Sequence, residues 1–100
     1  KAGVPPEQVI PFLRQVAEWP GLRVVGLMTV APVASNPETV RPVFRRLREL
    51  AHRVAEELRD VPGVEMRHLS MGMTDDFEVA VEEGATIVRI GRGIFGERPR

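Results

Sequence analysis

The chain has 100 residues, which suffices for one domain at most and is short for a large central core. Its 43% hydrophobic and 28% charged residues are typical of a globular protein, and its 14 basic and 14 acidic side chains cancel, so no overall field favours nucleic acid or an acidic membrane. Cysteine is absent, which excludes disulfides, thiolate metal sites and cysteine nucleophiles.

Lysine is almost absent as well. Lys1 is the single lysine among the basic residues, so the chain has no interior lysine for a Schiff base. No apolar run approaches the roughly 20 residues that cross a bilayer, and no charged-then-apolar leader is evident, which predicts a cytoplasmic location. Because the chain begins with lysine just ahead of an expected helix, we expect it to be a piece of a longer protein.

The first expected helix covers residues 5–19, where apolar side chains recur at steps of three and four. These side chains are Val9, Phe12, Leu13, Val16 and Trp19. Pro11 fits this helix without a kink only if the helix proper begins near Val9 or Ile10. Residues 23–30, RVVGLMTV, follow as an apolar run too continuous for a one-sided strand, which predicts a strand covered on both faces.

A long amphipathic helix is expected from about Glu38 to Asp60. Pro42 is tolerated there only in the first turn, and the many charged residues of the segment are interpreted as its solvated side. The run from Val64 to Ser70, VEMRHLS, predicts a second strand.

A short helix is expected within residues 74–84, TDDFEVAVEEG. Thr74 is suited to cap this helix, the acidic residues after it favour its positive end, and Gly84 suits its exit. The apolar run from Thr86 to Gly91 predicts a third strand.

The order of helix and strand alternates three times along the chain. Such alternation predicts an α/β protein with parallel strands joined by helical crossovers. Three parallel strands leave both sheet edges open, and two completions are plausible: an open doubly wound sheet, or a (β/α)8 barrel of which this chain supplies the last three β/α units.

Ligands of such folds bind at the carboxyl ends of the strands, where MTVAPVASN, SMGMTDD and GRGIFG are expected to lie. Backbone N–H groups of the last two glycine-containing segments can approach a phosphate closely. GRGIFG also matches the G-x-G-x-x-G spacing of dinucleotide-binding proteins. That interpretation fails on context, because only ERPR follows the third glycine, where a helix and a second strand are required.

Arg89 is a lone charge in the apolar third strand and shares a strand face with Gly91. Two interpretations stay open for it: this face meets water at a sheet edge, or the guanidinium contacts an anionic ligand. Arg92, between two glycines, is either a second anion contact or a solvated loop residue.

His68 and Ser70 lie two residues apart on one strand and share a face. A nucleophile triad with Asp75 is disfavoured, because a base two residues along a strand lacks the required geometry. We predict no catalytic residue and no metal site, since the carboxylates and histidines form no ligand set. A hydroxyl at a strand end suits Ser70 for a phosphate contact, with a plain turn serine as the alternative.

Residues 68–98, HLSMGMTDDFEVAVEEGATIVRIGRGIFGER, resemble the carboxyl-terminal signature of the pyridoxal phosphate homeostasis proteins, also called proline synthase co-transcribed homologues. Upstream, KAGVPPEQV, WPGLRVVGLMTVAP and NPETVRPVFRRLREL are similar to the same family in the same order. The resemblance spans nearly the whole chain, residues 1–100, as one partial domain. It implies a fold-type III barrel related to the alanine racemase N-terminal domain, with pyridoxal 5′-phosphate as the cofactor.

The same resemblance implies which residues hold the cofactor. The phosphate contacts are Ser70 with the Met71 and Gly72 backbone, and Gly91 with the residue after it, while Arg89 lies beside the cofactor. The family commonly has threonine after that glycine, whereas this chain has Arg92, which removes a hydroxyl contact and adds a positive charge. The cofactor's lysine belongs to an early strand of the family pattern, with no counterpart here.

The hypothesis that follows is a cofactor-binding role in vitamin B6 homeostasis, and not an enzyme. A racemase-like enzyme is the alternative, although racemisation usually needs a tyrosine and this chain has none. A phosphate binder for another ligand, or a structural half-barrel, also stays open. The expected partners are a small-molecule cofactor and either the missing amino-terminal half or another copy, with neither nucleic acid nor a membrane.

Overall fold

The computed structural model describes residues 3–91 of the chain. Its elements in chain order are the 3₁₀ helix η1 (Pro6–Gln8), α1 (Val9–Val16), β1 (Val24–Met28), the 3₁₀ helix η2 (Pro37–Val40), α2 (Arg41–Glu57), β2 (Val64–Met73), α3 (Phe77–Glu82) and β3 (Ile87–Arg89). The predicted alternation of helix and strand is confirmed over these residues.

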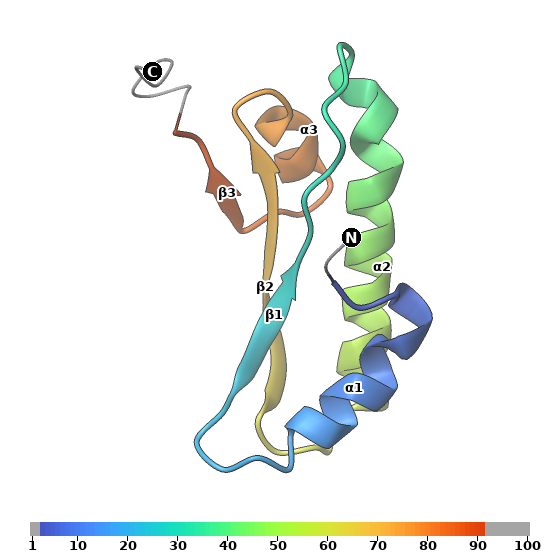
Figure 1. Cartoon of the computed structure of the whole chain (residues 1–100), viewed down its shortest axis with the longest axis vertical. Helices are drawn as coiled ribbons and strands as arrows, with labels where there is room; N and C mark the ends of the chain where they lie inside the picture. The colour runs from blue at the N-terminus through green and yellow to red at the C-terminus, as the bar shows by residue number, and fades with distance from the viewer. Residues whose placement is uncertain (1–2, 92–100) are drawn as a thin grey trace.

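The three strands form one parallel sheet in the order β1-β2-β3. Helices α1 and α2 lie along the same side of the strands, and α3 packs close to β2 (Figure 1). The predicted α/β class with a parallel sheet is therefore confirmed. Within residues 3–91 both outer strands, β1 and β3, have one edge without a neighbouring strand.

The prolines set where the helices begin. Helix α1 begins at Val9, directly after η1, so Pro11 falls in its first turn, as predicted. Helix α2 begins at Arg41 after η2, and Pro42 occupies its first turn. The Asn36 side chain caps η2 by accepting a hydrogen bond from the Glu38 N–H at 3.0 Å.

Two clusters of buried side chains join the helices to the sheet. The first lies between α1, α2 and the beginning of the sheet and contains Val9, Leu13, Leu50, Val54 and Leu58. The second lies between α2, α3 and the end of β2 and contains Val40, Phe44, Met71, Val79 and Ala80. The second cluster therefore supports the carboxyl end of β2, where the ligand site was expected.

The opposite side of the sheet carries no helix within the described residues. The prediction that residues 23–30 form a strand covered on both faces is wrong for this part of the chain. Val25, Met28 and Val30 are 40%, 60% and 54% exposed, because the described helices pack on one side of the strands. The strand is also shorter than predicted and ends at Met28.

Two further expectations need correction. Helix α3 begins at Phe77, with Asp76 and not Thr74 at its N-cap position. The reason is that β2 continues to Met73, and the Asp76 carboxylate accepts the Met73 N–H at 2.7 Å in the turn that follows. Gly84 follows α3 as predicted, whereas β3 is confined to Ile87–Arg89.

Candidate functional site

The carboxyl end of β2 contains an irregularity that shapes the candidate site. Ser70 pairs with Ile87 and Met73 pairs with Arg89, so β2 uses three residue steps where β3 uses two. This is a β-bulge, in which one strand carries an extra residue. Ser70 lies in β2 as predicted, whereas Met71 and Gly72, contrary to expectation, also lie inside the strand and not in a loop after it.

Gly72 makes the bulge possible. Its φ of +104° lies in a region that residues with a Cβ rarely adopt, and a Cβ placed there would lie 2.7 Å from the Ala80 Cβ and 3.2 Å from the Phe77 Cα. The β2 backbone thus approaches α3 more closely than any side chain would allow. The missing side chain at position 72 determines the path of the strand beside Ser70.

The alternation of side chains separates two faces at this end of the sheet. Leu69 and Met71 pack into the second cluster, so Ser70 between them points to the other face. On β1, Leu27 packs against the first cluster, so the next residue, Met28, points away from the helices. On β3, a Val88 methyl lies near Gly72 on the helical side, so Ile87 and Arg89 also point away from the helices. We call this side the open face, defined by the side chains of Met28, His68, Ser70, Met73, Ile87 and Arg89.

The open face brings together two of the predicted site residues. Ser70 is half-buried and Arg89 is exposed, and they lie on neighbouring strands. The Arg89 guanidinium has neither an ion pair nor a hydrogen bond with any other residue in the range 3–91, and the same holds for the Ser70 hydroxyl. Met28, Met73 and Ile87 beside them are 60%, 44% and 43% exposed. A cation and a hydroxyl that have no partner among the described residues thus lie beside exposed apolar side chains.

The other predicted site residues are placed differently. The Met71 side chain is only 2% exposed and belongs to the core, so only its backbone is available to a ligand. Gly91 follows β3, and apart from its chain neighbours no atom of the described residues lies within 4 Å of the position of a Cβ there. The prediction for Arg92 concerns a residue outside the described part of the chain.

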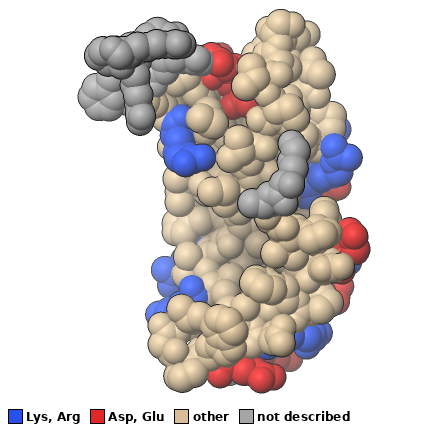
Figure 2. All heavy atoms as spheres, in the orientation of Figure 1, with Lys and Arg blue, Asp and Glu red and all other residues tan. Residues whose placement is uncertain are grey.

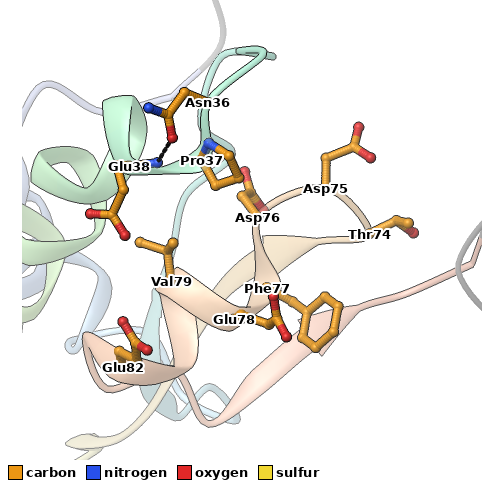
Figure 3. Close-up of a pocket in the computed structure, with 10 residues that line it drawn as sticks. All are labelled: Asn36, Pro37, Glu38, Thr74, Asp75, Asp76, Phe77, Glu78, Val79 and Glu82. Atoms are coloured by element: carbon orange, nitrogen blue, oxygen red, sulfur yellow. Dashed lines mark hydrogen bonds between the residues drawn. The ribbon is translucent and has the colours of Figure 1, made fainter.

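A pocket of about 310 Å³ lies on the helical side of the same end of the sheet. Figure 3 shows that Asn36, Pro37 and Glu38 face α3 and the turn before it across this pocket. Its acidic lining residues are Glu38, Asp75, Asp76, Glu78 and Glu82. Because these carboxylates repel an anion, the pocket does not suit a phosphate. Within residues 3–91 no group of three or more histidines and carboxylates is placed to hold a metal ion.

A second hollow of about 430 Å³, the β1 groove, lies between α1, β1 and α2. Its lining is mostly apolar and includes Val9, Phe12, Leu27 and Leu50. Figure 2 shows the side of the molecule on which β1 lies, with charged residues mainly toward the margins and uncharged ones across the middle. The groove adjoins the strand edge that has no neighbour among the described residues.

A cluster of charged side chains links the C-terminal end of α3 to α2. Glu83 is 5% exposed, and its carboxylate accepts hydrogen bonds from Arg41 at 2.9 Å and from Arg48 at 2.8 Å, with Arg45 at 3.5 Å. The hydrogen bond from Arg41 holds the pKa of Glu83 below its ordinary value of 4.5, and Arg45 and Arg48 act in the same direction against burial. The interpretation of the charged residues as a solvated side is therefore wrong for Arg41 and Arg48, which are partly buried against Glu83, whereas Arg45 is exposed. The spacing of four and three residues aligns the three arginines toward α3.

Replacing Glu83 with glutamine is expected to lower the melting temperature more than replacing Glu82, because three guanidinium groups lose a buried partner. A depressed folded-state pKa contributes stability that is fully present above the unfolded-state pKa and is lost as the pH falls through the folded-state value. Thermal unfolding from pH 7 to pH 3 should therefore show a gap between wild type and Glu83→Gln that closes in acid. A gap of equal size at every pH would contradict this assignment.

Glu82→Gln is the matched control for this measurement. Glu82 also contacts Arg41, at 2.5 Å, but its side chain is 64% exposed. An exposed ion pair contributes little to stability, so this variant should melt close to the wild type.

Comparison with known proteins identifies the family to which this chain belongs. The model of the alanine racemase N-terminal domain matches residues 1–99. A pyridoxal phosphate homeostasis protein of Aquifex aeolicus is 54% identical over 98 residues, which cover 98% of this chain and 41% of that protein. The human protein of the same name is 40% identical over 100 residues and is covered to 36%. The chain thus spans about 40% of the length of the curated relatives it matches.

Solved structures agree with these matches. The structure of PipY from Synechococcus elongatus without PLP superposes with a TM-score of 0.83 at 32% identity, over 96% of this chain and 43% of that one. PipY with PLP bound gives a TM-score of 0.79 over 96% and 44% of the two chains. The resemblance seen in the sequence is confirmed by these findings. No helix within residues 3–91 is long and apolar enough to span a membrane.

Proposed function

Since the chain belongs to the alanine racemase N-terminal domain family, we propose that it forms part of a protein that binds pyridoxal 5′-phosphate and keeps this cofactor in balance. The names of its relatives and the PLP-bound form of PipY support this proposal. The role is binding and supply of the cofactor and not catalysis. We also propose a cytoplasmic location, which fits a role in the balance of a cofactor.

The open face is the observation that carries the proposal. The Arg89 guanidinium and the Ser70 hydroxyl are both without a partner within residues 3–91, and both face the side on which Met28, Met73 and Ile87 are exposed. A charged donor and a hydroxyl suit a phosphate ester, while the apolar side chains suit the flat face of an aromatic ring.

The proposed phosphate site has four further parts besides Ser70 and Arg89. The backbone N–H groups of Met71 and Gly72 approach the phosphate at the bulge, and Gly91 and Arg92 do so after β3. Apart from its chain neighbours, no atom of residues 3–91 lies within 4 Å of the position of a Cβ at Gly91, which allows a close approach of the ligand to the backbone there. When bound, the cofactor supplies an aldehyde that reacts with amines, whereas these residues bind and orient its phosphate.

We further propose that residues 1–100 are one partial domain, the last three β/α units of a (β/α)8 barrel. The open strand edges of β1 and β3, the exposed apolar side chains of the open face and the β1 groove all need covering, and the curated relatives are more than twice as long as the chain. Closure of a barrel would turn the open face inward.

A chain whose single lysine is Lys1 should not retain the cofactor covalently. We expect that pyridoxal 5′-phosphate mixed with the 100-residue chain gives no visible imine absorbance that survives gel filtration. The reason is that an imine formed with Lys1 or with the terminal amine is hydrolysed. The matched measurement is on a longer protein that includes the lysine-bearing strand, which should retain the band. A stable band on the 100-residue chain would contradict the assignment of the lysine to another part of the protein.

The racemase-like alternative is tested with the same longer protein. A racemase exchanges the α-proton of an amino acid with solvent, whereas a cofactor-binding protein does not. We expect no exchange in deuterated water by proton NMR. Catalytic exchange would replace the binding role by an enzymatic one.

A further inference from the structure

His68 is a titratable side chain of the open face that the phosphate site does not use. It lies two residues before Ser70 on β2 and is exposed. Its register partner on β1 is Gly26, where a Cβ would lie 2.2 Å from the His68 carbonyl oxygen and 3.0 Å from the His68 Cβ, so only glycine allows the two strands to approach this closely. On the other side the ring contacts Thr86, whose hydroxyl oxygen lies 3.3 Å from His68 Nδ1.

The surroundings of Thr86 determine which ring nitrogen of His68 carries the proton. The Thr86 hydroxyl oxygen accepts the Leu69 N–H at 3.0 Å and has one proton to donate. The Leu69 carbonyl is a poor acceptor for it, because it lies 3.5 Å away and already accepts the Thr86 N–H at 2.9 Å. The contact with His68 Nδ1 is the shorter of the two open to this proton, and with the hydroxyl donating there a neutral imidazole carries its own proton on Nε2. That leaves an N–H donor on the imidazole edge remote from Thr86.

The spacing on β2 relates this donor to the phosphate site. Two residues along a strand are about 6.6 Å apart, so His68 stands one side-chain layer below Ser70 on the same face. A phosphate ester on a six-membered ring reaches across such a distance, with the phosphate at one end and a ring oxygen at the other. Met28 and Ile87, the register partners of Ser70 on both sides, supply apolar contacts between the two layers.

We propose that His68 recognises the ring of the bound ligand, with its Nε2–H donating a hydrogen bond to an oxygen substituent of a phosphorylated pyridine. This inference rests on the proposed function and adds a ring contact to its phosphate contacts. His68 then distinguishes a vitamin B6 phosphate from inorganic phosphate, which Ser70 and Arg89 alone do not.

The test uses pyridoxine 5′-phosphate, which has no aldehyde and forms no imine with Lys1 or the terminal amine. Its affinity and that of inorganic phosphate are measured by titration calorimetry at pH 8. Removing one hydrogen bond in His68→Leu should weaken binding of pyridoxine 5′-phosphate about 3- to 10-fold and leave phosphate binding unchanged. His68→Gln, which keeps an N–H donor, should recover most of the loss.

His52, the other histidine, provides the control. It is exposed on α2, and His52→Gln should bind both ligands like the wild type. In proton NMR spectra, pyridoxine 5′-phosphate should shift the ring signals of His68 and not those of His52. Circular dichroism melting of each variant verifies that the fold is retained.

Three results overturn the inference. Equal losses of pyridoxine 5′-phosphate and phosphate affinity in His68→Leu would make His68 a structural residue. Binding that depends on Arg89 but not on His68 would reject the ring contact alone. Failure of the wild-type chain to bind either ligand would reject the phosphate site and the ring contact together.

Discussion

Replacement of Arg89 by glutamine is expected to lower the affinity of the chain for pyridoxine 5′-phosphate by about 10- to 100-fold, since a hydrogen bond to a charged group contributes about 1.5–3 kcal/mol. Arg89 pairs with Met73 across the sheet and has no acidic partner within residues 3–91. Its charge is therefore available to a ligand, and its removal should leave no buried carboxylate unpaired. The affinity is measured by titration calorimetry against both pyridoxine 5′-phosphate and inorganic phosphate.

Arg67→Gln is the control for this substitution. Arg67 lies on β2 nearer to its beginning, is also exposed and pairs with Glu65 at 3.2 Å. The same loss of charge there should leave the affinity within about twofold, because Arg67 already has an acidic partner and an exposed ion pair contributes little. Equal losses of affinity in the two variants would mean that Arg89 acts only through its positive charge and not through a direct contact with the ligand.

The salt dependence of binding also distinguishes a direct contact of Arg89 with the ligand from a general effect of positive charge. Attraction between a ligand and the overall charge of a protein weakens as the Debye length falls, to about 10 Å at 0.1 M salt. The difference between wild type and Arg89→Gln should persist at that ionic strength, because the proposed contact is direct. A difference that vanishes with added salt would contradict a bound guanidinium.

The helices could be predicted well from the sequence because their signals are local. Apolar residues at steps of three and four defined α1 and α2. The rule that proline belongs in a first turn predicted a start of α1 near Val9 or Ile10, and the helix begins at Val9. The parallel sheet followed from the alternation of elements. Neither result depends on contacts between distant residues.

The end of β2 could not be predicted because it depends on pairing across the sheet. SMGM, with a glycine between two methionines, reads as a loop by composition. The pairing of Met73 with Arg89 keeps the segment in the sheet, and the bulge at Gly72 accommodates the additional residue. The sequence pattern identified Ser70 and Arg89 as site residues, but only the register shows that they share the open face.

The arginines of α2 illustrate a different limit. Their charge suggested a solvated helix face, and the buried carboxylate that they surround belongs to a residue some 40 positions later. The spacing of Arg41, Arg45 and Arg48 on one helix face was the available signal. Without knowing where α3 packs, that signal does not identify Glu83 as the partner.

Gly72→Ala is expected to destabilise the chain by about 2–4 kcal/mol, the sum of a strained backbone conformation and an overpacked contact. The added methyl group would need φ near +104° and would lie 2.7 Å from the Ala80 Cβ in the second cluster. A domain of this size is marginally stable, so such a loss should lower the melting temperature by more than 10 °C. Thermal unfolding followed by circular dichroism measures the effect.

Gly21→Ala separates the two causes. Gly21 also has a positive φ, +83°, but nothing lies within 4 Å of the position of its Cβ. This variant should lose only the backbone contribution, about 1 kcal/mol. Equal losses in both variants would mean that contact with α3 is unimportant at Gly72. The larger loss at Gly72 would instead show that β2 and α3 are held at a separation that excludes any side chain.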